Sequence, residues 1–432
     1  MKIKFVLSFT LALVVGSSFA FAHTILRDAS TLSRGKIPNE RLDYSSVTLL
    51  GSNPTFTSFI GAQQAVVIVG TSSVRGATII TTTTAGINIA IASSTNRGGN
   101  VFIQAGNYGP TDPIGVNENV TLIWESSAVL KFNQNDVLRN IFIVSGTVIT
   151  PTIDISTSLY STSLHTALFD FKKDGKVFYP DLRLHIGTYI SANAPWRGPT
   201  LGAFLFGPQA IGAILDHPNI STFTFLNPVG SSVGLNLFVV NGASQSQIIE
   251  PTINGNQTNV SVTNEGWFNI MACDGFQITG GNIKLSERLL GVGPNAGTPS
   301  GLIKNFSWKG GNIYNFANTD ATSGIITFES ETVDFSTGNE VSGMTIQHMV
   351  NVTNPTFSTN AQVGKVNGAL FTNNTVLFMA GSTGAAFKIS GVNDIFTIIR
   401  DNSVFGTSTF ISDSGTQTRY TTLGNFLNGV QQ

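Results

Sequence analysis

The stretch GGNIKLSERLLGVGPNAGTPSGLIKNFSWKGGNIYNF, residues Gly280 to Phe316, contains the same four residues twice, at Gly280–Ile283 and at Gly310–Ile313. The interval between the two copies is thirty residues. Self-similarity at a fixed interval of roughly 20 to 50 residues is typical of a solenoid, in which every repeat forms one turn of a coil. The stretch therefore predicts a coil of about 30 residues per turn, stacked on the next turn.

An aliphatic residue recurs at the same place in the neighbouring repeats, and the residue before it is polar every time. The aliphatic positions are Ile253, Ile283, Ile313, Ile346, Val376 and Val404, and the polar positions are Thr252, Asn282, Asn312, Thr345, Thr375 and Ser403. This alternation has the period of two of a β-strand. The stacked strands predict an all-β fold, a parallel β-helix. The alternative is an antiparallel β-sandwich, which also has short strands but needs no fixed period.

The composition is poor in charge and in cysteine. Charged residues make up 11% of the chain, and the formal net charge is -1. This balance excludes the basic surface of a nucleic-acid-binding protein or of a protein held on an anionic membrane by charge. Stacked coils explain the scarcity, because amides can bond along a file of like residues whereas like charges would repel. Cys273 is the only cysteine and is predicted to be a buried apolar side chain.

The N-terminal residues 1–22, MKIKFVLSFTLALVVGSSFAFA, have the pattern of a secretory signal peptide. Lys2 and Lys4 precede an apolar run, and Ala20 and Ala22 form the small-x-small site that a signal peptidase cuts. We therefore expect a secreted or cell-surface protein with no membrane span in its mature form. A membrane-spanning helix is the weaker alternative, because Ser8, Thr10 and residues 16–18 interrupt the apolar run.

A second stretch, GGNVFIQAGNYGPTDPIGVNENVTLIW at residues 98–124, resembles the first coils of the pectate-lyase-like superfamily. The match is carried by Gly98, Gly99, Val101, Ala105, Gly106, Tyr108, Pro113, Ile114, Val116, Asn119, Val120, Thr121 and Leu122. The resemblance implies a right-handed parallel β-helix over residues 98–432 and an extracellular polysaccharide as partner. It implies no single activity, because the superfamily contains lyases, glycoside hydrolases, phage tailspikes and non-catalytic surface proteins.

Two further segments complete the predicted organisation. Residues 28–52 resemble a stalk repeat of tail fibres, which implies a homotrimer, so residues 23–97 are predicted to be a stalk-like or linker region. Residues 165–218 break the repeat and are predicted to be an irregular insertion. This insertion contains His165, His185, His217, Tyr179, Trp196 and several prolines, and exposed aromatic side chains at its surface could stack on sugar rings. The alternative is that its apolar residues only pad the coil.

The residue after each recurring aliphatic position is the candidate binding site. These positions are Asn254, Lys284, Tyr314, Gln347, Leu377 and Phe405, and the first four are polar. If the strands stack, a cation, a phenol and two amides face solvent at intervals of one coil. We therefore predict that Lys284, Tyr314 and Gln347, together with Trp196, bind an extended glycan.

Catalysis is an open alternative. Pectate lyases use carboxylates that hold calcium and a basic residue that removes the proton next to a uronate carboxyl group, and the candidates here are Asp274, Lys284 and Lys304. Asp274 precedes Lys304 by one period, so we expect the two to lie in neighbouring coils and to form a structural ion pair, which is favoured over a catalytic role. No grouping of acidic residues in the sequence has enough carboxylates close together for a good calcium site, and no metal or cofactor is predicted. The protein is therefore either a lyase or glycoside hydrolase, or a non-catalytic structural or adhesive surface protein.

Overall fold

The structure is a computed structural model, and it divides into two compact units. It describes residues 49–50, 53–54, 66–73, 76–95, 99–132, 140–155, 167–184, 202–226, 237–259, 268–285, 289–293, 303–315, 324–330, 338–349, 352–353, 355–361, 366–391, 394–413 and 420–432. The first unit comprises residues 1–64 and 73–76, and its strands β1 (Leu49–Leu50) and β2 (Asn53–Pro54) pair antiparallel. The predicted signal peptide lies outside the described residues, as does the stalk-like segment before Leu49.

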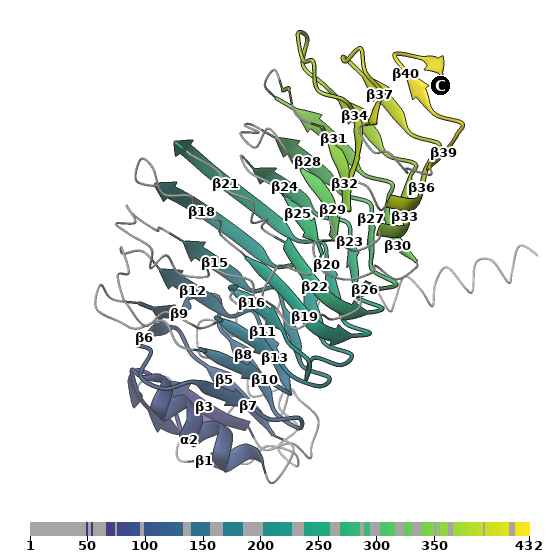
Figure 1. Cartoon of the computed structure of the whole chain (residues 1–432). Coiled ribbons are helices and arrows are strands. Elements are labelled where there is room, and N and C mark those ends of the chain that lie inside the picture. The colour runs from purple at the N-terminus through teal and green to yellow at the C-terminus, as the bar shows by residue number, and fades with distance from the viewer. Residues whose placement is uncertain are drawn as a thin grey trace, which may run out of the picture. The chain divides into compact units, whose positions relative to one another are not determined.

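The second unit, residues 65–72 and 77–432, is a right-handed parallel β-helix with three long sheets (Figure 1). Its first sheet contains β7 (Ile114–Val116), β10 (Phe142–Val144), β13 (Phe169–Phe171), β16 (Phe204–Phe206), β19 (Phe238–Ser244), β22 (Phe268–Asp274), β25 (Leu290–Val292), β26 (Ile303–Lys304), β29 (Ile326–Ser330), β32 (Phe357–Ala361), β35 (Phe387–Gly391) and β38 (Ile411–Asp413).

The second sheet contains β3 (Val66–Gly70), β4 (Ile79–Ile80), β5 (Asn100–Ile103), β8 (Thr121–Trp124), β11 (Thr147–Ile149), β14 (Lys176–Phe178), β17 (Ile214–Asp216), β20 (Gln247–Ile249), β23 (Gln277–Thr279), β27 (Ser307–Lys309), β30 (Asn339–Ser342), β33 (Val366–Thr372), β36 (Asp394–Arg400) and β39 (Tyr420–Leu423). The third sheet contains β6 (Gly106–Tyr108), β9 (Ala128–Lys131), β12 (Thr152–Ile155), β15 (Asp181–Leu184), β18 (Asn219–Leu226), β21 (Thr252–Asn259), β24 (Asn282–Leu285), β28 (Asn312–Asn315), β31 (Thr345–His348), β34 (Thr375–Leu377), β37 (Ser403–Phe405), β40 (Phe426–Leu427) and β41 (Val430–Gln431). Successive coils add strands to the three sheets, with β25 and β26 of one coil both pairing with β22, and coil-to-coil pairing is parallel, which excludes the β-sandwich.

The repeated Gly-Gly lies at the corner between the second and third sheets. One residue per coil turns this corner with a positive φ, and we call these residues the corner file: Thr150, Tyr179, His217, Glu250, Gly280, Gly310, Gly343, Asn373, Asp401 and Gly424. Glycine adopts this left-handed conformation without the strain that a Cβ atom brings. The next glycine is needed as well, since a Cβ on Gly311 would lie 2.7 Å from the backbone oxygen of Gly280.

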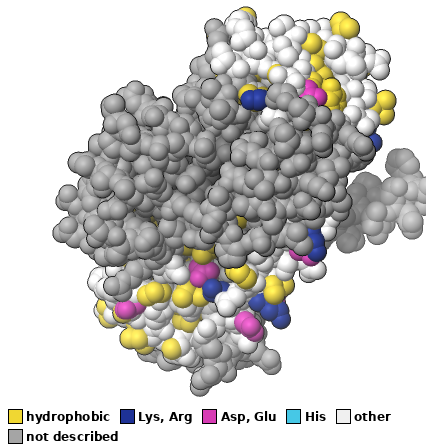
Figure 2. All heavy atoms as spheres, in the orientation of Figure 1, with side chains coloured by type: hydrophobic (Ala, Val, Ile, Leu, Met, Phe, Trp, Pro, Cys, Tyr) yellow, Lys and Arg dark blue, Asp and Glu magenta, His cyan; other side chains and the backbone are white. Residues whose placement is uncertain are grey.

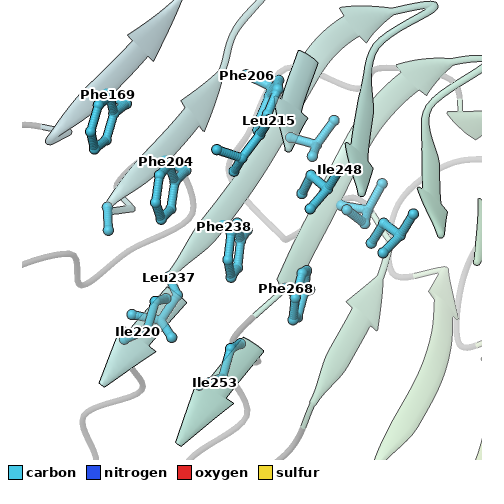
Figure 3. Close-up of a cluster of buried hydrophobic side chains, with 14 of the residues drawn as sticks. Phe169, Phe204, Phe206, Leu215, Ile220, Leu237, Phe238, Ile248, Ile253 and Phe268 are labelled. Carbon is cyan, nitrogen blue, oxygen red and sulfur yellow. The ribbon is translucent and has the colours of Figure 1, made fainter. Parts of the chain in front are cut away.

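The core consists of files of like side chains, as the repeat predicts. Ile253 pairs with Ile283, which pairs with Ile313, and the file continues through the remaining predicted positions to Val404. On the first sheet a file of phenylalanines stacks with nearly parallel rings (Figure 3): the ring centroids of Phe204 and Phe238 lie 5.0 Å apart at 7°. Burial of these large apolar side chains supplies the main stabilisation.

A buried ladder of asparagines follows the corner file in the last coils. Asn374, Asn402 and Asn425 are each 1% exposed or less. The Nδ2 atom of Asn374 donates to Oδ1 of Asn402 at 3.0 Å, and that of Asn402 donates to Asn425 at 3.0 Å. Their Nδ2 atoms also reach backbone oxygens of the preceding coil, so these buried amides are satisfied. The prediction that amides bond along the stack is confirmed here.

The coil begins before the predicted boundary at residue 98. Strand β3 pairs in parallel with β5, and helix α2 (Thr84–Thr95) packs against β3, β5 and β7 at the N-terminal end of the coil. Ile87, Ala90 and Ile91 of this helix belong to the main core. The assignment of residues 66–95 to a stalk or linker therefore differs from the structure. The helix has no charged residue, so its sequence lacks the polar face that identifies an amphipathic helix.

The predicted insertion at residues 165–218 also differs from the structure in its described part. Two ordinary coils run through it, formed by β13, β14 and β15 and then by β16, β17 and β18, and both keep the parallel register of their neighbours. The physical reason is that the chain between the third sheet of one coil and the first sheet of the next varies in length. The period is lost from the sequence there, although the strands persist.

Candidate functional site

The outer face of the third sheet carries two files of exposed or half-buried side chains. The first, the Thr/Asn file, contains Thr252, Asn282, Asn312, Thr345, Thr375 and Ser403. The second, the outer file, contains Asn254, Lys284, Tyr314, Gln347, Leu377 and Phe405 in the predicted register. Because neighbouring strands lie about 4.8 Å apart, each file presents one side chain per coil at that interval. The predicted alignment of Lys284, Tyr314 and Gln347 is confirmed.

Lys284 is the cation among the six residues of the outer file. Its side chain is exposed, while Tyr314 and Gln347 in the next coils are half-buried. Among the ion pairs between described residues none involves Lys284, whereas Arg183, nearer the N-terminus of the sheet, has its Nε 3.0 Å from Oδ2 of Asp181. An ammonium group of this kind can donate hydrogen bonds to an anionic or polar ligand.

The outer file becomes apolar toward the C-terminus. Leu377 is half-buried and Phe405 is 40% exposed. One continuous file thus offers hydrogen-bonding groups at one end and apolar surface at the other. Such a mixture suits a sugar polymer, whose rings have polar edges and apolar faces.

The three catalytic candidates are not brought together. Asp274 and Lys304 are paired neighbours on β22 and β26 in the first sheet, as the period predicts. Lys284 lies beyond the whole second-sheet strand β23, on the third sheet. Ten residues along a coil are enough to pass from one sheet to another, which the linear spacing conceals. Within the described part of the chain, therefore, these residues form no common catalytic group.

Asp274 and Lys304 also do not form the predicted ion pair among the described contacts. The Oδ1 atom of Asp274 instead accepts a hydrogen bond from Nδ2 of Asn305 at 3.5 Å. Both side chains are exposed. Solvent competes for such charges, and an exposed pair contributes little even where it forms.

Two titratable side chains near this region are buried and carry no charge at neutral pH. Burial raises the pKa of the Cys273 thiol to about 12, so this cysteine is not a nucleophile. Burial lowers the pKa of His348 to about 4. His348 stacks on Phe378 with ring centroids 4.5 Å apart, and its Nε2 lies 2.9 Å from Oγ1 of Thr356. The outer face of the third sheet therefore gains no charge from His348.

The described residues contain no cluster of three or more histidine, cysteine, aspartate or glutamate side chains suited to a metal ion. They also include no helix with the length and apolar character of a membrane span. Trp196, predicted to bind glycan, lies outside them. In the view of Figure 2, side chains of either charge are few and scattered among uncharged ones.

The Thr/Asn file was not among the residues predicted to form the site. The file has the same period as the isoleucines and lies beside the outer file on every strand, so its signal was present in the polar residue before each isoleucine. Its hydroxyl and amide groups widen the candidate site from one file to two.

No family model matches the chain, and no curated protein is similar to it in sequence. A mutant tailspike protein of E. coli bacteriophage HK620 is similar in structure, with a TM-score of 0.53 and 13% identity over 80% of this chain and 63% of that chain. Another mutant of that tailspike, in complex with a hexasaccharide, gives a TM-score of 0.51 with 13% identity over 80% and 62% of the two chains. PfbA, a surface adhesin of Streptococcus pneumoniae, gives 0.49 with 13% identity over 80% and 87%.

These comparisons concern the fold. At 13% identity the two tailspike structures support the parallel β-helix and say nothing of this chain's activity. The chain spans less than two thirds of the tailspike's length.

Proposed function

We propose that the protein is secreted or exposed at a cell surface and binds an extracellular polysaccharide along the outer face of its third sheet. The observation that carries the proposal is the pair of files in continuous register over six coils, from β21 to β37. A polymer with a regular repeat is a ligand that such a regular row of donors and acceptors can contact many times.

The chemistry of the outer file supports a glycan more than a peptide or a nucleic acid. Lys284 can donate to a carboxylate or hydroxyl group, Gln347 can donate and accept, and Tyr314 offers a ring face as well as a hydroxyl group. A single cation among neutral side chains cannot balance the dense charge of a nucleic acid. The saccharide bound by the tailspike belongs to that protein, and the shared fold only makes the same use of a β-helix surface plausible here.

The proposal is tested with the mature chain, residues 23–432, on an array of acidic and neutral glycans, followed by calorimetry with each glycan that binds. Lys284→Ala removes a charge-assisted hydrogen bond worth roughly 1.5 to 3 kcal/mol, so its Kd should rise roughly tenfold to hundredfold. Tyr314→Ala should raise the Kd about tenfold through the loss of ring contacts.

Lys309→Ala is the matched control. Lys309 is also an exposed lysine, but it lies on the second sheet, with its Nζ 3.3 Å from Oε2 of Glu340. Its substitution should leave the Kd unchanged. Equal effects of Lys284→Ala and Lys309→Ala, or no binding to any glycan on the array, would contradict the proposal.

Turnover is measured on the same glycans by the absorbance of unsaturated chain ends and by reducing sugar. Binding without turnover places the protein with the adhesive and structural class. Turnover would place it with the lyases or hydrolases, and its loss in Asp274→Asn or Lys304→Ala would identify the first sheet as the catalytic face.

A further inference from the structure

The corner file carries aromatic rings at two successive coils. Tyr179 and His217 have φ angles of 51° and 49°, in the left-handed region that disfavours any residue with a Cβ atom. Later coils place either a glycine, as at Gly280, or a non-aromatic residue, as at Glu250 and Asn373, at the equivalent position. The fold thus needs the backbone conformation but not the rings.

The two rings are packed on each other rather than into the core. Their centroids lie 5.1 Å apart with the planes tilted by 33°. Tyr179 is 53% exposed, and the His217 side chain is 46% exposed. Core burial therefore does not explain them, and together they present aromatic surface to solvent.

A carboxylate fixes the orientation of the histidine. The Nδ1 atom of His217 lies 2.6 Å from Oδ1 of Asp216, whose side chain is only 17% exposed. Because a carboxylate accepts and does not donate, the proton of this bond belongs to Nδ1 of His217. The Nε2 atom is left for a second partner, and the imidazole is held in one orientation before any ligand arrives.

We propose that Tyr179 and His217 form a stacking platform for one sugar ring of the bound polysaccharide. The C–H bonds on one face of a pyranose carry partial positive charge and fit the negative face of one of these rings, on the side that the other ring does not cover. The Tyr179 hydroxyl and Nε2 of His217 lie at the polar edges, where they can bond ring hydroxyl groups. The inference rests on the proposed function in that the ligand is a glycan.

The position of the platform connects it to the two files. His217 is followed by Pro218 and Asn219, and Asn219 pairs with Thr252, the first residue of the Thr/Asn file. The platform therefore stands at the corner where the third-sheet face begins, on coils just before those of Thr252 and Lys284. A glycan extended along the sheet can reach both.

The test uses substitutions that remove each ring without straining the corner. Tyr179→Gly and His217→Gly place glycine where φ is positive, so both variants should unfold at the same temperature as the parent or higher. Tyr179→Phe keeps the ring and is the positive control, and Tyr179→Asn or His217→Asn removes a ring with a residue that tolerates positive φ if a glycine variant fails to fold. Asn373→Gly is the matched control, because Asn373 occupies the corner file with a φ of 55° in a distant coil.

Binding is followed by saturation-transfer difference NMR with the methyl glycosides of glucose, galactose and N-acetylglucosamine, and with each hexasaccharide that the array selects. We expect the ring protons of the sugar to receive saturation in the parent, in Tyr179→Phe and in Asn373→Gly. The signal should fall at least fivefold in Tyr179→Gly and in His217→Gly.

The outcomes separate this inference from the proposed function. If Lys284→Ala weakens hexasaccharide binding while both ring variants leave it unchanged, the sheet face stands and the platform is wrong. If the ring variants abolish binding and Lys284→Ala has no effect, the platform stands without the outer file. If the two rings bind tetramethylammonium but none of the tested sugars, the platform is not a glycan site.

Discussion

His348 illustrates how one buried side chain couples the coil to pH. Its ring is 2% exposed and its pKa falls from 6.5 to about 4 because burial disfavours the charged form. The unfolded chain therefore binds a proton between these two values while the folded chain does not. The contribution of the neutral His348 to the unfolding free energy is fully present above about pH 6.5 and is lost progressively as the pH falls toward 4.

The predicted loss is about 3 kcal/mol of unfolding free energy between pH 7 and pH 4, since one pKa unit corresponds to about 1.4 kcal/mol. Urea unfolding at several pH values measures it. His348→Gln removes the titration, so subtracting its pH profile from that of the parent isolates this residue from the carboxylates. If the unfolding free energies of the two proteins depend on pH in the same way, protonation of His348 does not destabilise the folded chain and the prediction is wrong.

At the scale of the element, the corner between the second and third sheets is the part of the coil that tolerates least change. Gly311 combines a φ of 116° with a Cβ position 2.7 Å from the backbone oxygen of Gly280. That oxygen belongs to the corner of the preceding coil and accepts from Nε1 of Trp308 at 3.1 Å, so it cannot move without breaking this bond.

Gly311→Ala should therefore lower the unfolding free energy by about 1 to 3 kcal/mol. The control is Gly115→Ala in β7, where an added Cβ meets nothing within 4 Å. This second variant should keep the stability of the parent within about 0.5 kcal/mol. Denaturant unfolding of the two variants side by side checks the expectation, and equal stabilities would mean that the corner can rearrange.

Sequence reasoning succeeded for elements whose period is strict. Residues 252–254, 282–284 and 312–314 repeat at one interval, and their strands lie in the predicted register. It failed where the element is set by tertiary packing. The helix Thr84–Thr95 closes the end of the coil through Ile87 and Ile91, and a single terminal helix has no repeat to reveal it.

At the scale of the whole molecule, the same contrast applies to the candidate site. The outer file could be predicted from the period, because its members occupy the same position in successive repeats of the sequence. The grouping of Asp274 with Lys284 could not be judged from spacing, since the two lie on different sheets of the same coil. The Tyr179–His217 pair lies in coils whose connecting segments vary in length, so the sequence showed the aromatic residues without their stacking.

The predicted oligomeric state depends on residues 28–52, which precede the β-helix in the sequence. The sequence of residues 28–52 predicts a trimeric stalk, and residues 1–64 belong to the first of the two units. The mature chain should therefore have the mass of a trimer in light scattering. Deletion of residues 23–64 should give a monomer that still unfolds cooperatively, because every strand of the three long sheets lies after residue 64.

The predicted trimer also has a consequence for the proposed glycan binding. Three glycan faces on one particle would raise the effective concentration of the second and third contacts, so binding to an immobilised polysaccharide should be tighter for a trimer than for the truncated monomer by about a hundredfold or more. Binding to a single hexasaccharide in solution should be the same for both. A monomeric mature chain, or a truncated chain that remains trimeric, would contradict the role assigned to residues 28–52.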